Sequence, residues 1–442
     1  MEPLELARQI VVRLQTSGHQ GYFVGGCVRD MLLGQNPKDY DIATDARPEE
    51  VTALFPDSDL VGAHFGVVLV RDSGAQVEVA TFRSDHTYVD GRHPVSVAFE
   101  TDPRQDVLRR DFTINALLLD PESGEILDFV GGREDLRNRL VRAIGDPEIR
   151  FHEDHLRLLR AVRFAARLDY QIEAGTLGAI QRLHHLILKV SAERVRDELI
   201  RILTEGGARR GFELLDETGL LADILPEVAA MKGVAQPPEY HPEGDVWIHT
   251  LLLLEKLENP SATLAMGALL HDVGKPPTFR VAERIRFDGH VEKGVEIATA
   301  IMNRLRFSSD QIRQVTALIA NHMRFKDVPQ MRESTLKRFL RVEKFAEHLE
   351  LHRLDCLSSH GHLEHYELMR RKWAEMPPGE LKPAPLITGQ DLIAAGYEPG
   401  PAFARILATV EDAQLEARIR TREEAMALVR AKFRVPEGSL VE

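Results

Sequence analysis

The feature that most constrains how this chain can fold is a glycine-rich turn followed closely by two aspartates. Gly25 and Gly26 stand in the middle of the segment Gly21–Gly34, and Asp39 and Asp41 come shortly after it. Alternating apolar residues predict a short strand before the glycines and another around the aspartates, with a helix between them. Such a strand–turn–helix–strand unit predicts an α/β domain with a mixed sheet.

The two motifs in this unit have complementary chemistry. Side chains two residues apart on a strand share a face, so Asp39 and Asp41 could both bind Mg²⁺. Gly25 and Gly26 let backbone amides approach phosphate groups, and the start of the following helix adds partial positive charge. Each motif is common in structural roles when it stands alone. Together they predict a site where metal ions bridge a nucleoside triphosphate and an attacking hydroxyl.

A third carboxylate could belong to this site. Glu78 lies on a predicted strand over 76–82, with Val77 and Val79 on its opposite face. Alternation alone does not decide whether Glu78 faces the metals or is an ordinary edge-strand carboxylate.

The composition is that of a soluble globular protein. The chain has 442 residues, of which 43% are hydrophobic and 28% charged, so several domains are expected. The sequence contains no apolar run of membrane-spanning length, and its first residues lack a signal-peptide pattern. Only two cysteines occur, which fits a reducing compartment. We therefore expect a cytoplasmic protein with no membrane partner.

The net charge of −13 argues weakly against a nucleic-acid partner. Arginines nevertheless gather between residues 133 and 167 and again between 194 and 210. They could form a basic face on an acidic molecule, or they could pair with neighbouring acids on solvated helices.

Strand patterns dominate the first 130 residues, and helical periodicity dominates the rest. We expect an α/β head followed by an all-α neck, body and tail. Loop and linker composition at the junctions predicts four parts. Their ranges are 1–145, 146–225, 226–360 and 361–442.

The head motifs resemble those of a known family. Gly25-Gly26-x-x-Arg29-Asp30 followed by Asp39-x-Asp41 is similar to the nucleotidyltransferase head of class II tRNA CCA-adding enzymes and of bacterial poly(A) polymerases. The resemblance implies template-independent addition of CMP and AMP, from CTP and ATP, to the 3′ end of tRNA. It also implies two-metal phosphoryl transfer with Asp39 and Asp41 as the catalytic Mg²⁺ ligands.

A second segment matches the same family. Arg109-Arg110-Asp111 and Asn115 are similar to its second motif, which holds the ribose and triphosphate. Arginine offers planar donors to phosphate oxygens, and an aspartate can accept from a ribose hydroxyl. Asp111 could instead cap the following element. The resemblance adds Arg29, Gly25 and Gly26 to the nucleotide-binding set.

A third segment predicts base selection. We expect a helix to begin within residues 152–160, placing Asp154 and Arg157 on one face. The carboxylate would accept from an exocyclic amino group while the guanidinium donates to a ring acceptor, an order that cytosine and adenine match and guanine and uracil reverse. Glu153 completes the family's Glu-Asp-x-x-Arg motif, and Arg160 is expected to contact phosphate. An ordinary surface ion pair is the alternative.

Further along, metal-type ligands occur in the order His, His-Asp, His, His, Asp. This order resembles the HD phosphohydrolase superfamily and implies a divalent transition metal or Mg²⁺, with the last two histidines serving mainly a second ion. The six residues are His249, His271, Asp272, His290, His322 and Asp355.

Several alternatives stay open. Motif content hardly separates full CCA addition from poly(A), CC-only or A-only addition. A long polar connection over 83–99 favours the complete activity, because in the family a loop here assists the switch from C to A. A different class of function would make the HD part the main enzyme and the head an inactive RNA-binding unit. The oligomeric state and the HD metal are not predicted.

Overall fold

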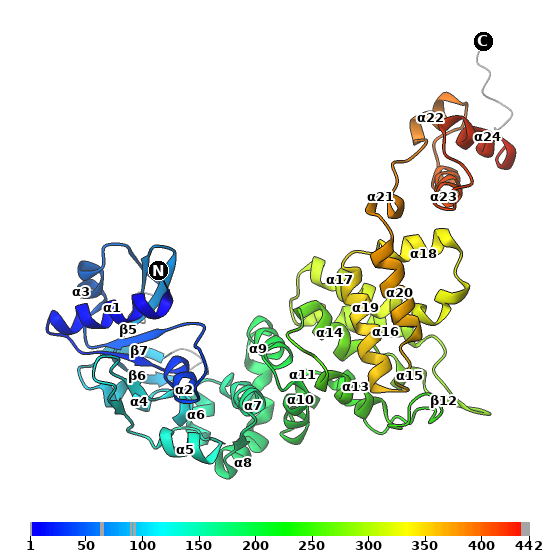
Figure 1. Ribbon diagram of the computed structural model, residues 1–442. Coiled ribbons are helices and arrows are strands. Elements are labelled where there is room, and N and C mark those ends of the chain that lie inside the picture. Colours follow the sequence, from blue (N-terminus) through cyan, green and yellow to red (C-terminus); the bar gives the residue numbers. More distant parts are fainter. Residues whose placement is uncertain (1, 62–65, 89–90, 92–93, 435–442) are drawn as a thin grey trace. The chain divides into compact units, whose positions relative to one another are not determined.

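The computed structural model describes residues 2–61, 66–88, 91 and 94–434 (Figure 1). Two compact units can be distinguished within it. The first comprises residues 1–232 with 257–265 and 301–307, and the second comprises 233–256, 266–300 and 308–442. The expected division into four parts stays a prediction.

A seven-stranded sheet forms the centre of the amino-terminal region (Figure 1). Its strand order is β3-β4-β5-β2-β1-β8-β9. β2 and β5 are parallel and the other neighbours are antiparallel, which confirms the expected mixed sheet. The strands are β1 (Gly21–Val24), β2 (Asp41–Thr44), β3 (Ser58–Leu60), β4 (Val67–Asp72), β5 (Ala75–Thr81), β8 (Leu118–Leu119) and β9 (Ile126–Leu127).

Helices flank this sheet. The amphipathic α1 (Pro3–Thr16) buries Leu6, Ile10 and Leu14, as its periodicity predicts. α2 (Gly26–Leu32) connects β1 to β2, so the predicted strand–turn–helix–strand unit is confirmed. The other helical elements of the head are α3 (Pro48–Leu54), α4 (Pro103–Leu108), the 3₁₀ turn η2 (Thr113–Asn115) and α5 (Gly132–Asn138).

The polar connection over 83–99 is a hairpin rather than an irregular loop. β6 (Arg83–Tyr88) and β7 (Pro94–Phe99) pair antiparallel as a separate two-stranded sheet. The expectation of a loop was wrong because the polar residues of the first half hid a strand, although Val95 and Val97 already alternate in the second half. Residues 89–90 and 92–93 lie outside the described residues.

Helices follow the head, with only short strand pairs between them. β10 (Leu140–Val141) pairs with β11 (Gln171–Ile172) beside this helical stretch. Asp146 caps the first helix by accepting from the backbone amide of Glu148, as the Asp-Pro pair predicts. The helices are α6 (Pro147–Glu153), α7 (Arg157–Leu168), α8 (Ala174–Leu183), η3 (His184–Lys189), α9 (Ala192–Thr204), α10 (Ala208–Glu217), α11 (Leu220–Ile224) and α12 (Pro226–Ala229).

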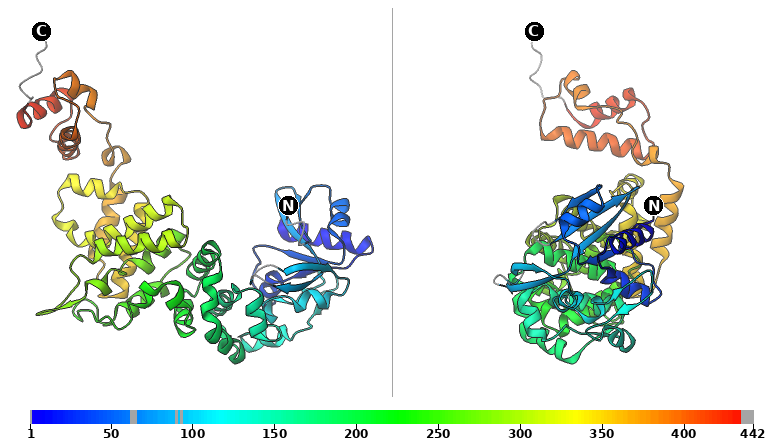
Figure 2. Two further views of the ribbon diagram at one scale, coloured as in Figure 1. Left: turned by 180° about the vertical axis from the view of Figure 1, so that it is seen from behind. Right: turned by 90° about the vertical axis from the view of Figure 1, so that its left-hand side faces the viewer.

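The second unit is helical apart from the short pair β12 (Arg280–Val281) and β13 (Ile285–Arg286) (Figure 2). Phe325, Phe339 and Phe345 centre one of its cores, and Leu392, Val410 and Val429 centre another near the carboxyl end. The helices from residue 246 onward are α13 (Val246–Glu255), α14 (Ala262–Leu270), α15 (Lys275–Thr278), α16 (His290–Arg304), α17 (Ser309–Asn321), η4 (His322–Gln330), α18 (Glu333–Leu340), α19 (Phe345–Ser358), α20 (Glu364–Glu375), α21 (Pro378–Leu381), α22 (Gly389–Ala394), α23 (Pro401–Leu415) and α24 (Arg422–Lys432).

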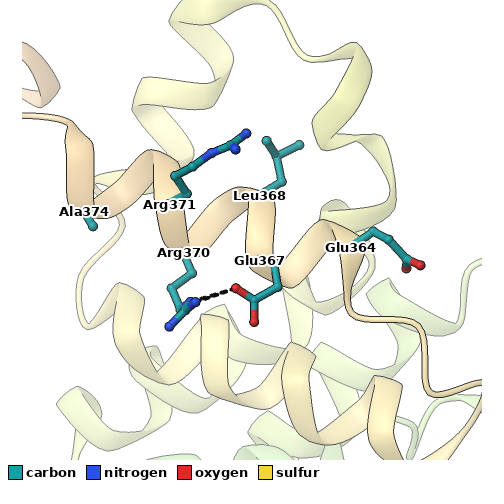
Figure 3. Close-up of a pocket in the computed structure, with 6 residues that line it drawn as sticks. All are labelled: Glu364, Glu367, Leu368, Arg370, Arg371 and Ala374. Carbon is teal, nitrogen blue, oxygen red and sulfur yellow. Dashed lines mark hydrogen bonds and ion pairs between the residues drawn. The ribbon is translucent and has the colours of Figure 1, made fainter.

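One open pocket of the second unit is lined by α20 alone (Figure 3). Its charged residues include Glu367, which accepts a hydrogen bond from Arg370 at 2.9 Å. Because a single helix lines it and its charges pair locally, we assign it no ligand. Among the described residues, no helix combines the length and apolar character needed to span a membrane.

Candidate functional sites

The predicted phosphate turn lies directly against the predicted metal ligands. Gly25 joins β1 to α2 with a φ of 81°, a conformation that glycine adopts without strain. A Cβ placed on Gly25 would lie 3.8 Å from Oδ2 of Asp41 and 3.7 Å from a terminal nitrogen of Arg110. The turn therefore brings its backbone close to both an acidic and a basic side chain.

Three carboxylates gather at the start of β2. Asp41 is the first residue of this strand, and Glu78 is its partner on the adjacent parallel strand β5, so their side chains share a face. Asp39 lies in the bend before β2, so the expectation that both aspartates stand on one strand was wrong. The bend still leaves Asp39 close enough to act electrostatically on Asp41.

The charges at this site repel one another. The pKa of Asp41 is raised to about 6, chiefly by partial burial of the carboxylate and then by the negative charges of Glu78 and Asp39. Arg110 opposes this shift. A divalent cation would relieve the repulsion, and oxygen ligands suit Mg²⁺, so the residues present fit such an ion.

The two arginines of the second motif share one partner that the sequence analysis missed. Asp106 is 1% exposed, and its two oxygens accept hydrogen bonds from Arg109 and Arg110 at 2.6–3.1 Å. Burial alone would raise the pKa of Asp106, but the two guanidinium groups outweigh it and lower the pKa. The spacings of three and four residues at the end of α4 were a helical signal that could have identified this partner.

The remaining predicted nucleotide ligands form a buried chain of contacts with one another. Arg29 is 2% exposed and donates to Asp30 and, at 2.6 Å, to Oδ1 of Asn115. Asn115 donates in turn to Asp111 at 3.3 Å. Asp111 also accepts from Arg160 at 2.5 and 2.8 Å.

This pairing decides the charge of Asp111. Although burial opposes it, the Arg160 guanidinium lowers the pKa of Asp111 to about 2. Asp111 also accepts from the backbone amide of Phe112 at 2.8 Å, but this bond does not cap η2, whose N-cap is Phe112 and has no side-chain cap. Ribose contact by Asp111 and phosphate contact by Arg29 and Arg160 stay predictions, because each side chain is already paired within the protein.

The base-selecting segment does not form one helix. α6 ends at Glu153, Asp154 has an extended backbone with φ −141°, and α7 begins at Arg157. The shared helix face expected for Asp154 and Arg157 was therefore wrong. Asp154 breaks the helix by accepting from the backbone amide of Leu156 at 3.1 Å, a local bond of the kind that competes with helix formation.

Each base-selecting side chain has its own ionic partner. Asp154 accepts from Arg194 of α9 at 2.9 and 3.1 Å. Arg157 donates to Glu153 at 2.7 Å and to the backbone carbonyls of Arg150 and Arg109. Arg194 belongs to the second group of arginines in the sequence, and its contact with Asp154, 40 residues away, could not be predicted from local spacing.

The six residues of the predicted HD site do come together. Nε2 of His249, from α13, lies 3.1 Å from Oδ1 of Asp355 on α19 and 3.3 Å from Nε2 of His271. These three residues offer ligand atoms that all lie within 4.8 Å of one another, and Asp272, His290 and His322 form a second such group. Oδ2 of Asp272 lies 3.2 Å from His271 and Oδ1 lies 3.9 Å from His322, so this carboxylate reaches toward both groups.

The ring nitrogens of this site are arranged as metal ligands require. Nδ1 of each of His271, His290 and His322 faces the backbone carbonyl three residues earlier, at 2.6–2.9 Å. The opposite nitrogens of His290 and His322 are buried with no hydrogen-bond partner. Burial lowers the pKa of His322 to about 4, so its ring is neutral near pH 7 and can donate a lone pair. Imidazole and carboxylate ligands together fit a divalent transition metal or Mg²⁺.

Three neighbours of these ligands were not singled out from the sequence. Glu243 lies between His241 and His249, and Lys275 donates to Asp272 at 2.7 Å. His241 and Glu243 stand in the loop before α13, where no periodic pattern marks them. Lys275 follows the His-Asp pair by three residues, and that short spacing was the available signal.

Comparison with protein families identifies three regions in this chain. Residues 21–142 match the poly A polymerase head domain, residues 169–232 match the probable RNA and SrmB-binding site of polymerase A, and residues 244–354 match the HD domain. These matches agree with the resemblance of the head and HD motifs in the sequence, and each of them covers less than half of the chain.

Curated relatives have a more specific name. The chain is 41% identical over 254 residues to the CCA-adding enzyme of Lactobacillus helveticus, and the match covers 56% of this chain and 63% of that enzyme. It is 45% identical over 212 residues to the CCA-adding enzyme of Enterococcus faecalis, covering 48% and 52%. The matches thus span between about half and two thirds of these relatives.

Solved structures extend the fold comparison to nearly the whole chain. The Bacillus stearothermophilus CCA-adding enzyme in complex with CTP is similar with a TM-score of 0.74 at 29% identity, covering 98% of both chains. The Thermotoga maritima CCA-adding enzyme complexed with tRNA_CCA has a TM-score of 0.60 at 20% identity and covers 98% of this chain and 96% of that one, which supports the fold alone.

Proposed function

We propose that this chain is a template-independent RNA nucleotidyltransferase that adds C and A residues to the 3′ end of tRNA, using CTP and ATP. The observation that carries the proposal is the meeting of Asp41, Glu78 and Arg110 at the Gly25 turn. Support comes from relatives named CCA-adding enzymes and from the B. stearothermophilus structure, which contains CTP. A cytoplasmic location follows from such a substrate.

The carboxylates would hold the metal ions and the arginines would hold the nucleotide. Asp39 and Asp41 would bind Mg²⁺, which when present neutralises triphosphate charge and favours ionisation of the RNA hydroxyl. Glu78, on the same face as Asp41, would add negative charge that strengthens cation binding. Arg110, held by Asp106, would present its free terminal nitrogen toward the phosphates.

The base-selecting residues retain the hydrogen-bonding capacity that the proposal needs. A carboxylate has about four acceptor positions, and Arg194 and the amide of Leu156 occupy three of those on Asp154. One position on Oδ2 stays open for a single exocyclic amino hydrogen. Asp154 can therefore accept from cytosine or adenine without losing its ion pair.

Arg157 has spare donors in the same way. Its Nη1 donates twice and its Nη2 once within the protein. Nε–H and one Nη2–H are left from the five donors of a guanidinium. Two donors are enough for the ring nitrogen and carbonyl of cytosine, whereas guanine and uracil would place their own N–H against them. A mismatch of this kind typically costs on the order of 1–3 kcal/mol per buried unpaired group.

A primer-extension assay tests the proposal and separates its variants. The full chain is given tRNA lacking CCA together with CTP, ATP or both, and product length is read on a gel. We expect two nucleotides added with CTP alone and three with both. Ladders longer than three nucleotides with ATP alone would assign a poly(A) polymerase instead, and a product that stops at CC with both nucleotides would assign a partial enzyme.

Two variants, each of which removes one negative charge, test whether nucleotide incorporation depends on the proposed site. Asp41→Asn should abolish incorporation while the thermal melting profile is retained. Asp59→Asn is the matched control, because Asp59 is an exposed sheet carboxylate on β3 that pairs with Arg71. Incorporation that survives in Asp41→Asn would reject the proposed site.

A second activity is favoured by the clustered histidines and aspartates of the HD region. We propose that this cluster binds divalent metal and hydrolyses phosphomonoesters or 2′,3′-cyclic phosphates, which could repair RNA ends before addition. Metal-dependent phosphate release should survive Asp41→Asn and be lost in Asp355→Asn. The control is Asp288→Asn, an exposed carboxylate paired with Arg286. If the wild type incorporates no nucleotide but releases phosphate, the HD region is the main enzyme.

A further inference from the structure

The loop before α13 makes an unassigned set of contacts with the HD cluster. Its two ends are tied together, because the amide of Gln236 donates to the carbonyl of Gly244 at 3.0 Å and Ala235 and Asp245 form an isolated β-bridge. Gln236 and Glu243 therefore stand on a closed loop whose ends hold one another. We name residues 235–245 the clamp loop.

Glu243 connects this loop to a metal-type ligand. Its side chain is 5% exposed, and Oε1 lies 2.8 Å from Nδ1 of His249 and 2.9 Å from Nδ1 of His241. Within the described residues its other oxygen, Oε2, has no hydrogen-bond partner, and the contact between Oε1 and Nδ1 of His249 is an ion-pair contact rather than an aligned hydrogen bond. A buried carboxylate shared by two imidazoles is expensive to maintain, so its position calls for a functional reason.

Glu243 gives His249 a partner unlike that of the other three histidines of the cluster. His271, His290 and His322 each face a neutral backbone carbonyl within their own helical turn. His249 instead lies against an anion supplied by the clamp loop. An anionic partner at Nδ1 keeps the proton on that nitrogen, directs the Nε2 lone pair toward the ion and increases the donor strength of the ring.

The clamp loop reaches a second ligand by a separate path. Oε1 of Gln236, a residue 2% exposed, accepts from Nζ of Lys275 at 2.6 Å. The same Nζ lies 2.7 Å from Oδ2 of Asp272. The clamp loop thus contacts both ligand groups. It contacts His249 of the first group directly, and it contacts Asp272 of the second group through Lys275.

We propose that Glu243 is a positioning residue for the HD metal centre, setting the tautomer and orientation of His249, with His241 and Gln236 holding Glu243 and the clamp loop in place. This inference rests on the proposed metal binding by the HD cluster. Glu243, His241 and His249 also offer ligand atoms within 4.8 Å of one another, so the number of ions bound distinguishes a positioning role of Glu243 from direct ligation.

Metal affinity of the full chain tests this inference. All variants carry Asp41→Asn, so that the head site does not contribute, and Mn²⁺ binding is measured by titration calorimetry together with the number of ions bound. Glu243→Ala should weaken Mn²⁺ binding by about 10- to 100-fold, the range typical for loss of a partner of a metal-ligating histidine, with the number of ions unchanged. Glu243→Gln, which keeps an acceptor at Oε1, should recover part of the affinity.

A matched control and a fold check separate the outcomes. Glu239→Ala removes an exposed carboxylate from the same loop and should leave Mn²⁺ affinity unchanged. Thermal melts without metal show whether each variant is folded, and Glu243→Gln serves if Glu243→Ala is not. Affinity in Glu243→Ala within about twofold of its parent would overturn the inference, as would loss of one whole ion, which would make Glu243 a direct ligand. Adding Asp355→Asn to the parent should abolish its Mn²⁺ binding. If the parent binds no Mn²⁺, or if its binding survives Asp355→Asn, the proposed metal site itself has failed.

Discussion

The carboxylate of Asp106 is expected to hold the proposed triphosphate-binding arginines in place, and its removal should be costly. Four hydrogen bonds from Arg109 and Arg110 end on its two oxygens. Asp106→Asn keeps the shape of the side chain but removes the charge and leaves only one oxygen to accept. One of the two guanidinium groups then loses its hydrogen bonds to residue 106.

The magnitude follows from the exposure of the partners. Breaking one side of a buried ion pair typically costs about 3–5 kcal/mol. The side chains of Arg109 and Arg110 are 19% and 18% exposed and can turn partly toward water, so we expect the lower end, about 3 kcal/mol. For a domain of this size that corresponds to a melting temperature lower by roughly 6–12 °C. Because Arg110 would also leave the Gly25 turn, the KM for CTP should rise more than kcat falls.

Calorimetric melting and steady-state extension of tRNA measure the two effects. Asp102→Asn is the control, because Asp102 lies on the same helix, caps it by accepting from the amide of Arg104 at 3.0 Å, and can be replaced as a cap by asparagine. The reasoning is refuted if Asp106→Asn melts within about 2 °C of Asp102→Asn, a difference below 1 kcal/mol on the same scale.

Three further predictions use other parts of the chain. Gly25→Ala should cost roughly 1 kcal/mol, because the residue has φ 81°, and should raise the KM for CTP; unchanged melting and kinetics would contradict this. Glu198→Ala removes the shorter of the two ion pairs of the buried Arg163, at 2.7 Å, and leaves only the contact with Glu205 at 3.4 Å. It should lower the unfolding free energy by about 3 kcal/mol in urea titrations, with exposed Glu193→Ala as the control. Burial lowers the pKa of His348 to about 4, so the unfolded chain takes up the proton first and stability falls as the pH drops from 6.5 toward 4. His348→Phe should lose less stability over that range, and parallel losses would refute the assignment.

Much of the fold could be predicted because local signals agreed with tertiary packing. α1 has the bounds that its apolar spacing indicates, and β1 and β2 appear where alternation predicts strands. The break at Asp154 could not be predicted from periodicity. The apolar pattern continues through it, but a single side chain bonded to the backbone amide of Leu156 is enough to end one helix before the next begins.

In the candidate sites, too, some residues could be predicted from the sequence and others could not. Residues that carry the chemistry were identifiable because metals and phosphates require particular donor types at particular spacings. Most residues that hold them were not, because Arg194 and Glu243 reach their partners from another helix or a loop. Asp106 and Lys275 lie within one helical turn of the motif residues that they contact, so these two contacts could have been predicted from sequence spacing.

The pairing of almost every proposed nucleotide ligand has a consequence for how substrate could bind. Asp111 and Arg160 pair with one another, and Asp106 pairs with the two arginines beside it, which leaves one positive charge in excess. Each of these charged groups therefore has a partner before any nucleotide is present. A triphosphate that binds Arg160 would therefore exchange an ion pair, whereas Arg110 keeps a terminal nitrogen that Asp106 does not bond. Replacing the carboxylate by a phosphate costs less than leaving the guanidinium buried without a partner, because the guanidinium is paired before and after the exchange. The exchange is also selective, because only an anion of matching shape can replace the carboxylate. On the proposed function, the unoccupied acceptor on Asp154 and the two spare donors on Arg157 would bind the base without any exchange of ion pairs.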